Sequence, residues 1–82
     1  MREQIKIAAK MYQCQESAQR LFKDEYVGKI KWYINTIKTV MEKEHLDELS
    51  SILFISNLPN VKNNGAAIML FMAAAVELIE KK

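Results

Sequence analysis

The chain has 82 residues, one cysteine and a net charge of +2. A chain of this length forms one domain and has only a small core to bury. Cys14 has no partner for a disulfide within the chain, and Cys14 and His45 together fall short of the ligand set of a structural zinc site. The sequence therefore predicts no metal and no cofactor, and a fold held by helix packing or self-association.

Charge and hydropathy exclude further classes of protein. Twelve basic residues against ten acidic ones do not make the dense basic patch of a dedicated nucleic-acid binder. Charged residues interrupt the N-terminal segment before an apolar run forms, which is not the pattern of a signal peptide, and no apolar run is long enough to span a bilayer. We expect a cytoplasmic protein with neither a membrane nor a nucleic-acid partner.

An all-α fold follows from the composition. With two glycines and one proline, the chain has few of the residues that form turns between strands, and good helix formers are frequent. We expect one helical domain over residues 1–82, a small oligomeric bundle of three to four helices. The first helix is predicted over about residues 2–22. Its core stripe comprises Ile7, Met11, Cys14, Ala18, Leu21 and Phe22, and a second, weaker apolar face comprises Ile5, Ala8, Ala9 and Tyr12.

A second helix is predicted from about Asp24, a candidate N-cap, to Glu44. Gly28 interrupts this helix at a cost of up to about 1 kcal/mol relative to alanine, which the close approach of a backbone or a ligand would explain. Trp32 lies nearly opposite the core stripe. The stripe comprises Tyr26, Val27, Ile30, Tyr33, Ile34, Ile37 and Met41, with Val40 at its edge.

A shorter third helix is expected after Leu46 and Asp47, a hydrophobic residue ahead of an N-cap. It ends before Pro59, because the residue that precedes a proline avoids the helical region. A polar turn follows, with room for one helical turn after Pro59. The expected inner face of the third helix comprises Leu49, Ile52, Leu53 and Ser56.

The last helix is predicted to run to about Glu80, and residues 66–76 are apolar without interruption. Either Asn63 or Asn64 caps it, or it begins near Pro59. A helix that is apolar on all sides needs cover on all sides, and three other helices, one of them short, are not expected to supply it. We therefore predict a homo-oligomer. Its interface is the second face of the first helix or this last helix, through Met69, Phe71, Met72 and Val76.

Candidate catalytic residues are few. His45 stands at an expected helix end, where a surface or capping role is favoured because helix C-termini attract cations. Cys14 lies on the core stripe, so we interpret it as a small hydrophobe rather than a nucleophile. The chain carries no glycine-rich phosphate loop, nucleophile elbow or metal-ligand spacing. We predict that the protein is not an enzyme, unless an active site assembles across subunits.

The candidate binding residues are aromatic residues with lysines beside them. Trp32, with Lys29 nearby, could stack on a flat ligand or anchor a protein partner, or another helix of the same chain could cover it. Tyr12 poses the same question. Its ring could hold a nucleotide base while Lys6 and Lys10 meet the phosphate, and the alternatives are a protein contact or a solvated lysine face. These five residues form the predicted ligand or partner site.

Two segments of the chain resemble a known group of proteins. They are Tyr26-Val27-Gly28-Lys29-Ile30, followed by Ile34, Ile37 and Lys38, and Asn64-Gly65-Ala66-Ala67-Ile68-Met69 at the start of the last helix. This pattern resembles small phage-encoded helical proteins, the cyclic-nucleotide sponges that counter CBASS immunity in bacteria. The resemblance rests on chain size, helix order and a glycine–methionine spacing rather than on a specific motif.

The resemblance implies a compact helical oligomer that binds a signalling nucleotide between subunits without cleaving it. This chain departs from the pattern in one respect, since its last helix has no Lys or Arg between Ala66 and Glu80 to meet a phosphate. Phosphate contacts would have to come from lysines of the first two helices. No binding residue is carried over from that group.

Three functions remain open at this point. The first is a non-catalytic oligomer that sequesters a small anionic ligand or a host protein, as a phage-type inhibitor of host immune signalling would. The second is a structural or adaptor protein that acts through protein contacts. The third, a helix-turn-helix regulator, is disfavoured because Asp47 and Glu48 open the third helix, where a recognition helix exposes basic or amide side chains.

Overall fold

The computed structural model describes residues 2–80, with side-chain burial from Lys6 onward. The two long helices are α1 (Arg2–Phe22) and α2 (Tyr26–Glu44), joined by the 3-10 turn η1 (Lys23–Glu25). They are followed by α3 (Glu48–Ser56), α4 (Pro59–Lys62) and α5 (Gly65–Glu80). The prediction of an all-α fold is confirmed, and no strand occurs within residues 2–80.

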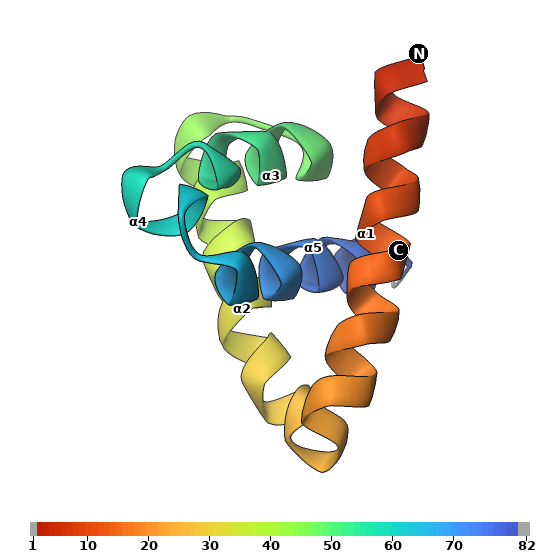
Figure 1. Ribbon diagram of the computed structural model, residues 1–82. Coiled ribbons are helices and arrows are strands. Elements are labelled where there is room, and N and C mark those ends of the chain that lie inside the picture. Colours follow the sequence, from red (N-terminus) through yellow and green to blue (C-terminus); the bar gives the residue numbers. More distant parts are fainter. Residues whose placement is uncertain (1, 81–82) are drawn as a thin grey trace.

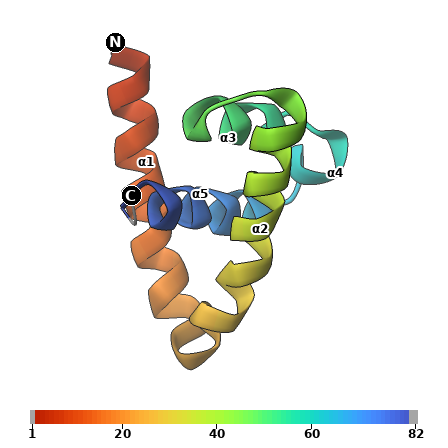
Figure 2. The same cartoon turned by 180° about the vertical axis from the view of Figure 1, so that it is seen from behind.

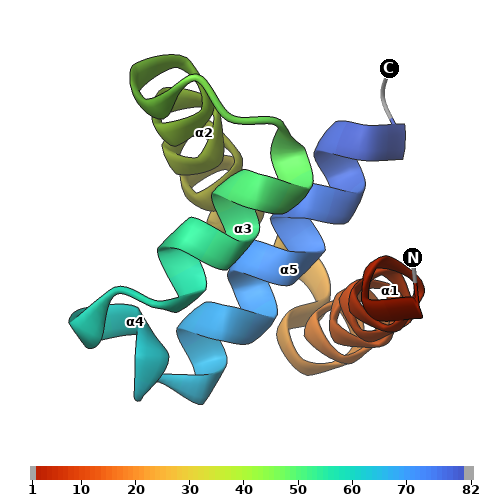
Figure 3. The same ribbon diagram turned by 90° about the horizontal axis from the view of Figure 1, so that it is seen from above.

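The helices are arranged around α5. Helices α1 and α2 form a V with η1 at its point, and α5 crosses between the two arms (Figures 1 and 2). Seen from above, α5 runs with α2 on one side and α1 on the other, and α3 lies along it (Figure 3). The most apolar helix of the chain is therefore its central element.

The central position of α5 overturns the prediction that its apolar side chains need a second chain to cover them. Phe71, Met72 and Val76 are only 4%, 8% and 1% exposed, and Met69 is half-buried. The alanines at positions 73–75 are fully buried, and their short side chains allow neighbouring helices to approach α5 closely. One chain thus supplies the cover, and these four residues no longer support the predicted homo-oligomer.

The buried faces of α1, α2 and α3 are narrower than the predicted stripes. Leu21, Val27 and Leu53 were assigned to those stripes, but all three are exposed. For Leu21 and Val27 the reason is geometric, because α5 crosses the arms α1 and α2 of the V rather than running along them. On α3 the inward positions are instead taken by Ser51 and Ile55, with Ile52 as expected.

The start of α2 also differs from its prediction. Asp24 lies inside η1 and makes no capping hydrogen bond, and the helix follows directly at Tyr26. The chain reverses at Lys23, whose φ of 48° lies in the left-handed region. A backbone reversal at one residue therefore separates α1 from α2 where the sequence suggested a side-chain cap.

The caps of the later helices follow the predictions. The carboxylate of Asp47 accepts a hydrogen bond from the backbone N–H of Ser50 at 2.8 Å and so caps α3. The side-chain oxygen of Asn64 accepts one from the N–H of Ala67 at 3.1 Å. Of the three alternatives for the start of α5, the structure therefore has the cap at Asn64. His45 is the exposed C-cap of α2 in a left-handed conformation, as the capping interpretation expected.

Candidate functional site

Trp32 is 63% exposed, so the alternative that another helix of the chain covers it is wrong. Its ring centroid lies 5.0 Å from that of Tyr33 and 6.2 Å from that of Phe71. The rings of Tyr33 and Phe71 meet edge to face at 4.8 Å. Because Phe71 belongs to the core, this aromatic cluster holds the indole against α5 and leaves most of it open to solvent.

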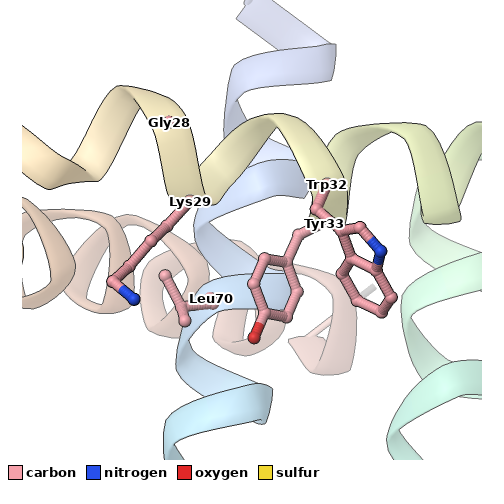
Figure 4. A pocket seen from close by; sticks show the side chains of 5 residues that line it. All are labelled: Gly28, Lys29, Trp32, Tyr33 and Leu70. Carbon is pink, nitrogen blue, oxygen red and sulfur yellow. The ribbon is translucent and has the colours of Figure 1, made fainter.

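A hollow of about 360 Å³ lies beside this cluster, and we call it the Lys29 hollow. Figure 4 shows Lys29 and Tyr33 extending from α2 on either side of Leu70 of α5, with the indole of Trp32 beyond Tyr33. Gly28 completes its lining. The Lys29 hollow therefore combines one ammonium group, two aromatic rings and a stretch of helix backbone without a side chain.

The ammonium group of Lys29 is close to a further aromatic ring. Its Nζ lies 5.2 Å from the centroid of the Phe22 ring at the end of α1. A cation is attracted to the face of an aromatic ring at this distance, which favours a side-chain position at the edge of the Lys29 hollow over a freely extended one. Lys29 itself is exposed, so its charge is open to an anion.

The surroundings of Gly28 exclude one of the two explanations offered for it, the close approach of another backbone. A Cβ placed on Gly28 would meet no atom within 4 Å, and its φ is not positive. Neither a close backbone nor a special conformation therefore requires glycine here. What the position does have is open space, since Gly28 lies on the lining of the Lys29 hollow.

A second hollow of about 270 Å³ lies further along α2, and we call it the α4 hollow. Trp32 and Tyr33 line both hollows, so these two rings stand between them. The remaining walls of the α4 hollow come from a further stretch of α2, from α3 and α5, and from the segment around α4, and they carry no charged side chain. The two hollows thus share an aromatic wall and differ in charge.

The predicted site residues separate into two groups. Trp32 and Lys29 lie together at the Lys29 hollow. Tyr12, Lys10 and Lys6 are exposed on α1, and among the described residues α1 contributes no side chain to the lining of either hollow. The structure therefore does not unite the five residues in one site.

Two site residues were missed by the sequence analysis. Tyr33 was assigned to the core stripe, but it is half-buried and forms part of the shared wall. Leu70 lay inside an unbroken apolar run, where nothing distinguished it from its neighbours. The pairing of Leu70 with α2 depends on how α5 crosses that helix, which local sequence does not encode.

The candidate catalytic residues lie elsewhere. Cys14 is half-buried, with its Sγ 3.8 Å from the Sδ of Met72, and burial raises the pKa of its thiol. This agrees with its interpretation as a packed side chain. No group of three or more potential metal ligands occurs among the described residues. Within the same residues, no helix is long and apolar enough to cross a membrane.

Comparisons with known proteins do not extend this description. No family model matches the sequence, and searches of curated proteins and of solved structures found no match either.

Proposed function

We propose that the protein is a non-catalytic binding protein that sequesters a small anion carrying a flat ring, of the nucleotide class. The observation that carries the proposal is the Lys29 hollow, where an exposed indole, an ammonium group and a bare helix backbone lie together. Sequestration of a signalling nucleotide in the cytoplasm would blunt a host immune response. That is the role implied by the resemblance to nucleotide sponges.

The chemistry of the Lys29 hollow fits such a ligand. Stacking of a base on an aromatic side chain contributes about 1–3 kcal/mol to binding. The ammonium group of Lys29 is a point charge suited to a phosphate. The volume of about 360 Å³ lies within the range of small-molecule sites, toward its lower end. A mononucleotide or one half of a cyclic dinucleotide is therefore the expected occupant.

The first experiment is a titration of the protein with mononucleotides, cyclic mononucleotides and cyclic dinucleotides. Trp32 is the only tryptophan of the chain, so its fluorescence reports directly on the proposed site. We expect saturable quenching by at least one nucleotide, which calorimetry confirms and which chromatography recovers uncleaved. The absence of heat and of quenching with the whole panel would contradict the proposal.

Substitutions locate the binding. Trp32→Ala and Lys29→Ala are each expected to weaken nucleotide binding by about tenfold or more, as the loss of one stacked ring or one phosphate contact implies. The matched controls are Val27→Ala and Lys38→Ala, which lie on the same helix and line neither hollow. If the control substitutions weaken binding as much as the site substitutions do, the nucleotide binds at a surface other than the Lys29 hollow.

Gly28→Ala separates binding from folding. The added methyl meets nothing in the protein, so the helix should gain up to about 1 kcal/mol of stability. Gly28 also lines the Lys29 hollow, so a methyl group added there should weaken nucleotide binding. A variant that is more stable in urea and binds less well is the expected result. Unchanged binding would show that no ligand approaches this backbone.

We also propose self-association through the second face of α1. Ala9 and Tyr12 of that face are exposed, and the side chain of Ile5 lies outside the described residues. Sedimentation of the wild type should show an oligomer that Tyr12→Lys dissociates. A wild type that sediments as a monomer at all concentrations would remove this part of the proposal.

An adaptor function is the second candidate, and the exposed apolar surface of α3 favours it. Leu53 and Phe54 are 47% and 42% exposed at neighbouring positions. An adaptor should lose its protein partner when both are replaced by serine, while the Lys29 hollow stays unchanged. The combined variant therefore separates the two functions in a pull-down carried out beside the nucleotide titration.

A further inference from the structure

The α4 hollow is a half-open, mainly apolar recess built on the core of the protein. Three of its lining residues, Ile55, Val61 and Phe71, are themselves buried, so its inner wall belongs to the core. An apolar protein cavity of about 150 Å³ is large enough to bind benzene. The α4 hollow measures about 270 Å³, so it has room for a ring larger than benzene.

Polar groups on the lining are few, and they are neutral. The hydroxyl of Thr36 donates to the backbone oxygen of Trp32 at 2.8 Å. The Oδ1 atom of Asn64 caps α5, which leaves the Nδ2 group out of the cap. Asn60 is exposed and brings a second amide to the lining. An amide can donate to an acceptor on a ligand without any charge being involved.

The lining selects the charge of the occupant. No Lys, Arg, Asp, Glu or His is among the residues that line the α4 hollow. A charged group seated against its inner wall would lose part of its hydration without gaining an ionic partner, which is costly. The aromatic walls formed by Trp32, Tyr33 and Phe71 offer ring faces and edges to a flat apolar group.

We propose that the α4 hollow is a binding subsite for an uncharged, ring-sized aromatic group that carries one hydrogen-bond acceptor. The subsite is separate from the Lys29 hollow and does not depend on what binds there. Trp32 and Tyr33 form the wall that this subsite shares with the Lys29 hollow.

A fluorinated probe tests the subsite directly. The neutral probe is 5-fluoroquinoline, a bicyclic ring with one acceptor nitrogen, and binding to the full chain is followed by fluorine NMR. The charged probe of similar width is 4-fluorobenzoate. We expect saturable binding of the quinoline that 4-fluorobenzoate does not displace. Displacement by the benzoate, or the absence of saturable quinoline binding, would overturn the proposal.

Two alanines on one helix provide matched variants. Ala67 lines the α4 hollow, whereas the neighbouring Ala66 is exposed and does not. Ala67→Leu fills the hollow and should weaken quinoline binding by about tenfold or more, whereas Ala66→Leu should leave it unchanged. Equal effects of the two variants would show that the quinoline binds elsewhere.

Asn60→Ala gives a second measurement that does not depend on the folding of Ala67→Leu. Asn60 is exposed, so its replacement leaves the core intact. Loss of one hydrogen bond should weaken quinoline binding roughly 2–10-fold. Lys29→Ala should leave the quinoline affinity unchanged, so failure of the nucleotide proposal and failure of this one are distinguishable. The proposal makes Asn60 the donor to the acceptor of the ring, so an Asn60→Ala variant with wild-type affinity for the quinoline would contradict it.

Discussion

Glu77 connects three helices through one carboxylate oxygen. Its Oε2 accepts hydrogen bonds from the Nε2 of Gln15 at 2.8 Å and from the hydroxyl of Tyr26 at 2.9 Å. Gln15 lies on α1, Tyr26 begins α2 and Glu77 belongs to α5, so this contact ties both arms of the V to the central helix. Burial first, then the hydrogen bond to Glu77, raises the pKa of Tyr26 above its usual value of about 10.

The raised pKa of Tyr26 predicts a loss of stability in alkali. The unfolded chain ionises this hydroxyl near its usual pKa, whereas the folded protein keeps the proton to a higher pH. The stabilisation is therefore fully present below about pH 10 and is lost as the pH rises above that value. Urea unfolding as a function of pH should show a steeper decline for the wild type than for Tyr26→Phe. Parallel curves would count against the linkage.

Ser51 presents the opposite case, a buried polar group that no contact stabilises. Its side chain is fully buried, and the Oγ atom has no hydrogen-bond partner among the described residues. Leaving a buried hydroxyl unsatisfied costs about 1–3 kcal/mol. Ser51→Ala should therefore raise the free energy of unfolding in urea. The exposed control Ser17→Ala reports the helix-propensity part alone, and a gain no larger than this control would disprove the explanation.

At the scale of elements, helix ends in this chain are set by two different means. Side-chain caps begin α3 and α5, and both caps have a sequence signature. The boundary between α1 and α2 instead depends on one left-handed residue, Lys23, which has no such signature. The cap of α3 was therefore predicted, Asn64 was one of three alternatives for the start of α5, and the start of α2 was not predicted.

The assignment of the α5 cap to Asn64 rather than Asn63 gives a direct test. Removal of an N-cap side chain costs about 0.5–2 kcal/mol. Asn64→Ala should therefore lower the free energy of unfolding by that amount, because the N–H of Ala67 loses its acceptor. Asn63→Ala should have little effect. Chemical denaturation of the two variants side by side decides the matter, and equal losses would argue for a different cap.

At the scale of the whole molecule, the fold is organised by a helix whose middle part is buried. Leu70 through Val76 are all buried, and α1, α2 and α3 pack around them. The apolar run first interpreted as an intermolecular surface is thus an intramolecular core. Most of the exposed large apolar side chains lie on the surrounding helices, among them Trp32, Leu53 and Phe54, and one, Ile79, lies near the end of α5.

Ala74 tests the central position of α5. This residue is fully buried within one chain, so Ala74→Leu should overpack the core and cost about 1–3 kcal/mol. The loss should be the same at every protein concentration, because no subunit interface is involved. Thermal melts at low and high concentration measure it, with the exposed Ala66→Leu as the control. A loss of stability that becomes smaller as the protein concentration rises would show that α5 lies at a subunit interface.

The site was predictable only in part. Trp32 and Lys29 stood out because an aromatic residue and a lysine lay off the apolar stripe of a helix with a fixed period. Tyr33 and Leu70 did not, since both fit a core pattern. The same local pattern singled out three residues of α1, namely Tyr12, Lys6 and Lys10. The fold does not bring them to Trp32, because none of them lines either of the two hollows.

The sequence by itself determined the helical class, the boundaries of α1, the caps of α3 and the apolar character of α5. All of these depend on residues close together along the chain, through propensity, periodicity and capping. Only the tertiary structure decided that α5 crosses between α1 and α2, that its apolar run is covered by its own chain, and that two hollows flank Trp32. Those features depend on contacts between residues that are distant along the chain. The presence of an apolar side chain does not indicate whether it will pack against the same chain or against another one.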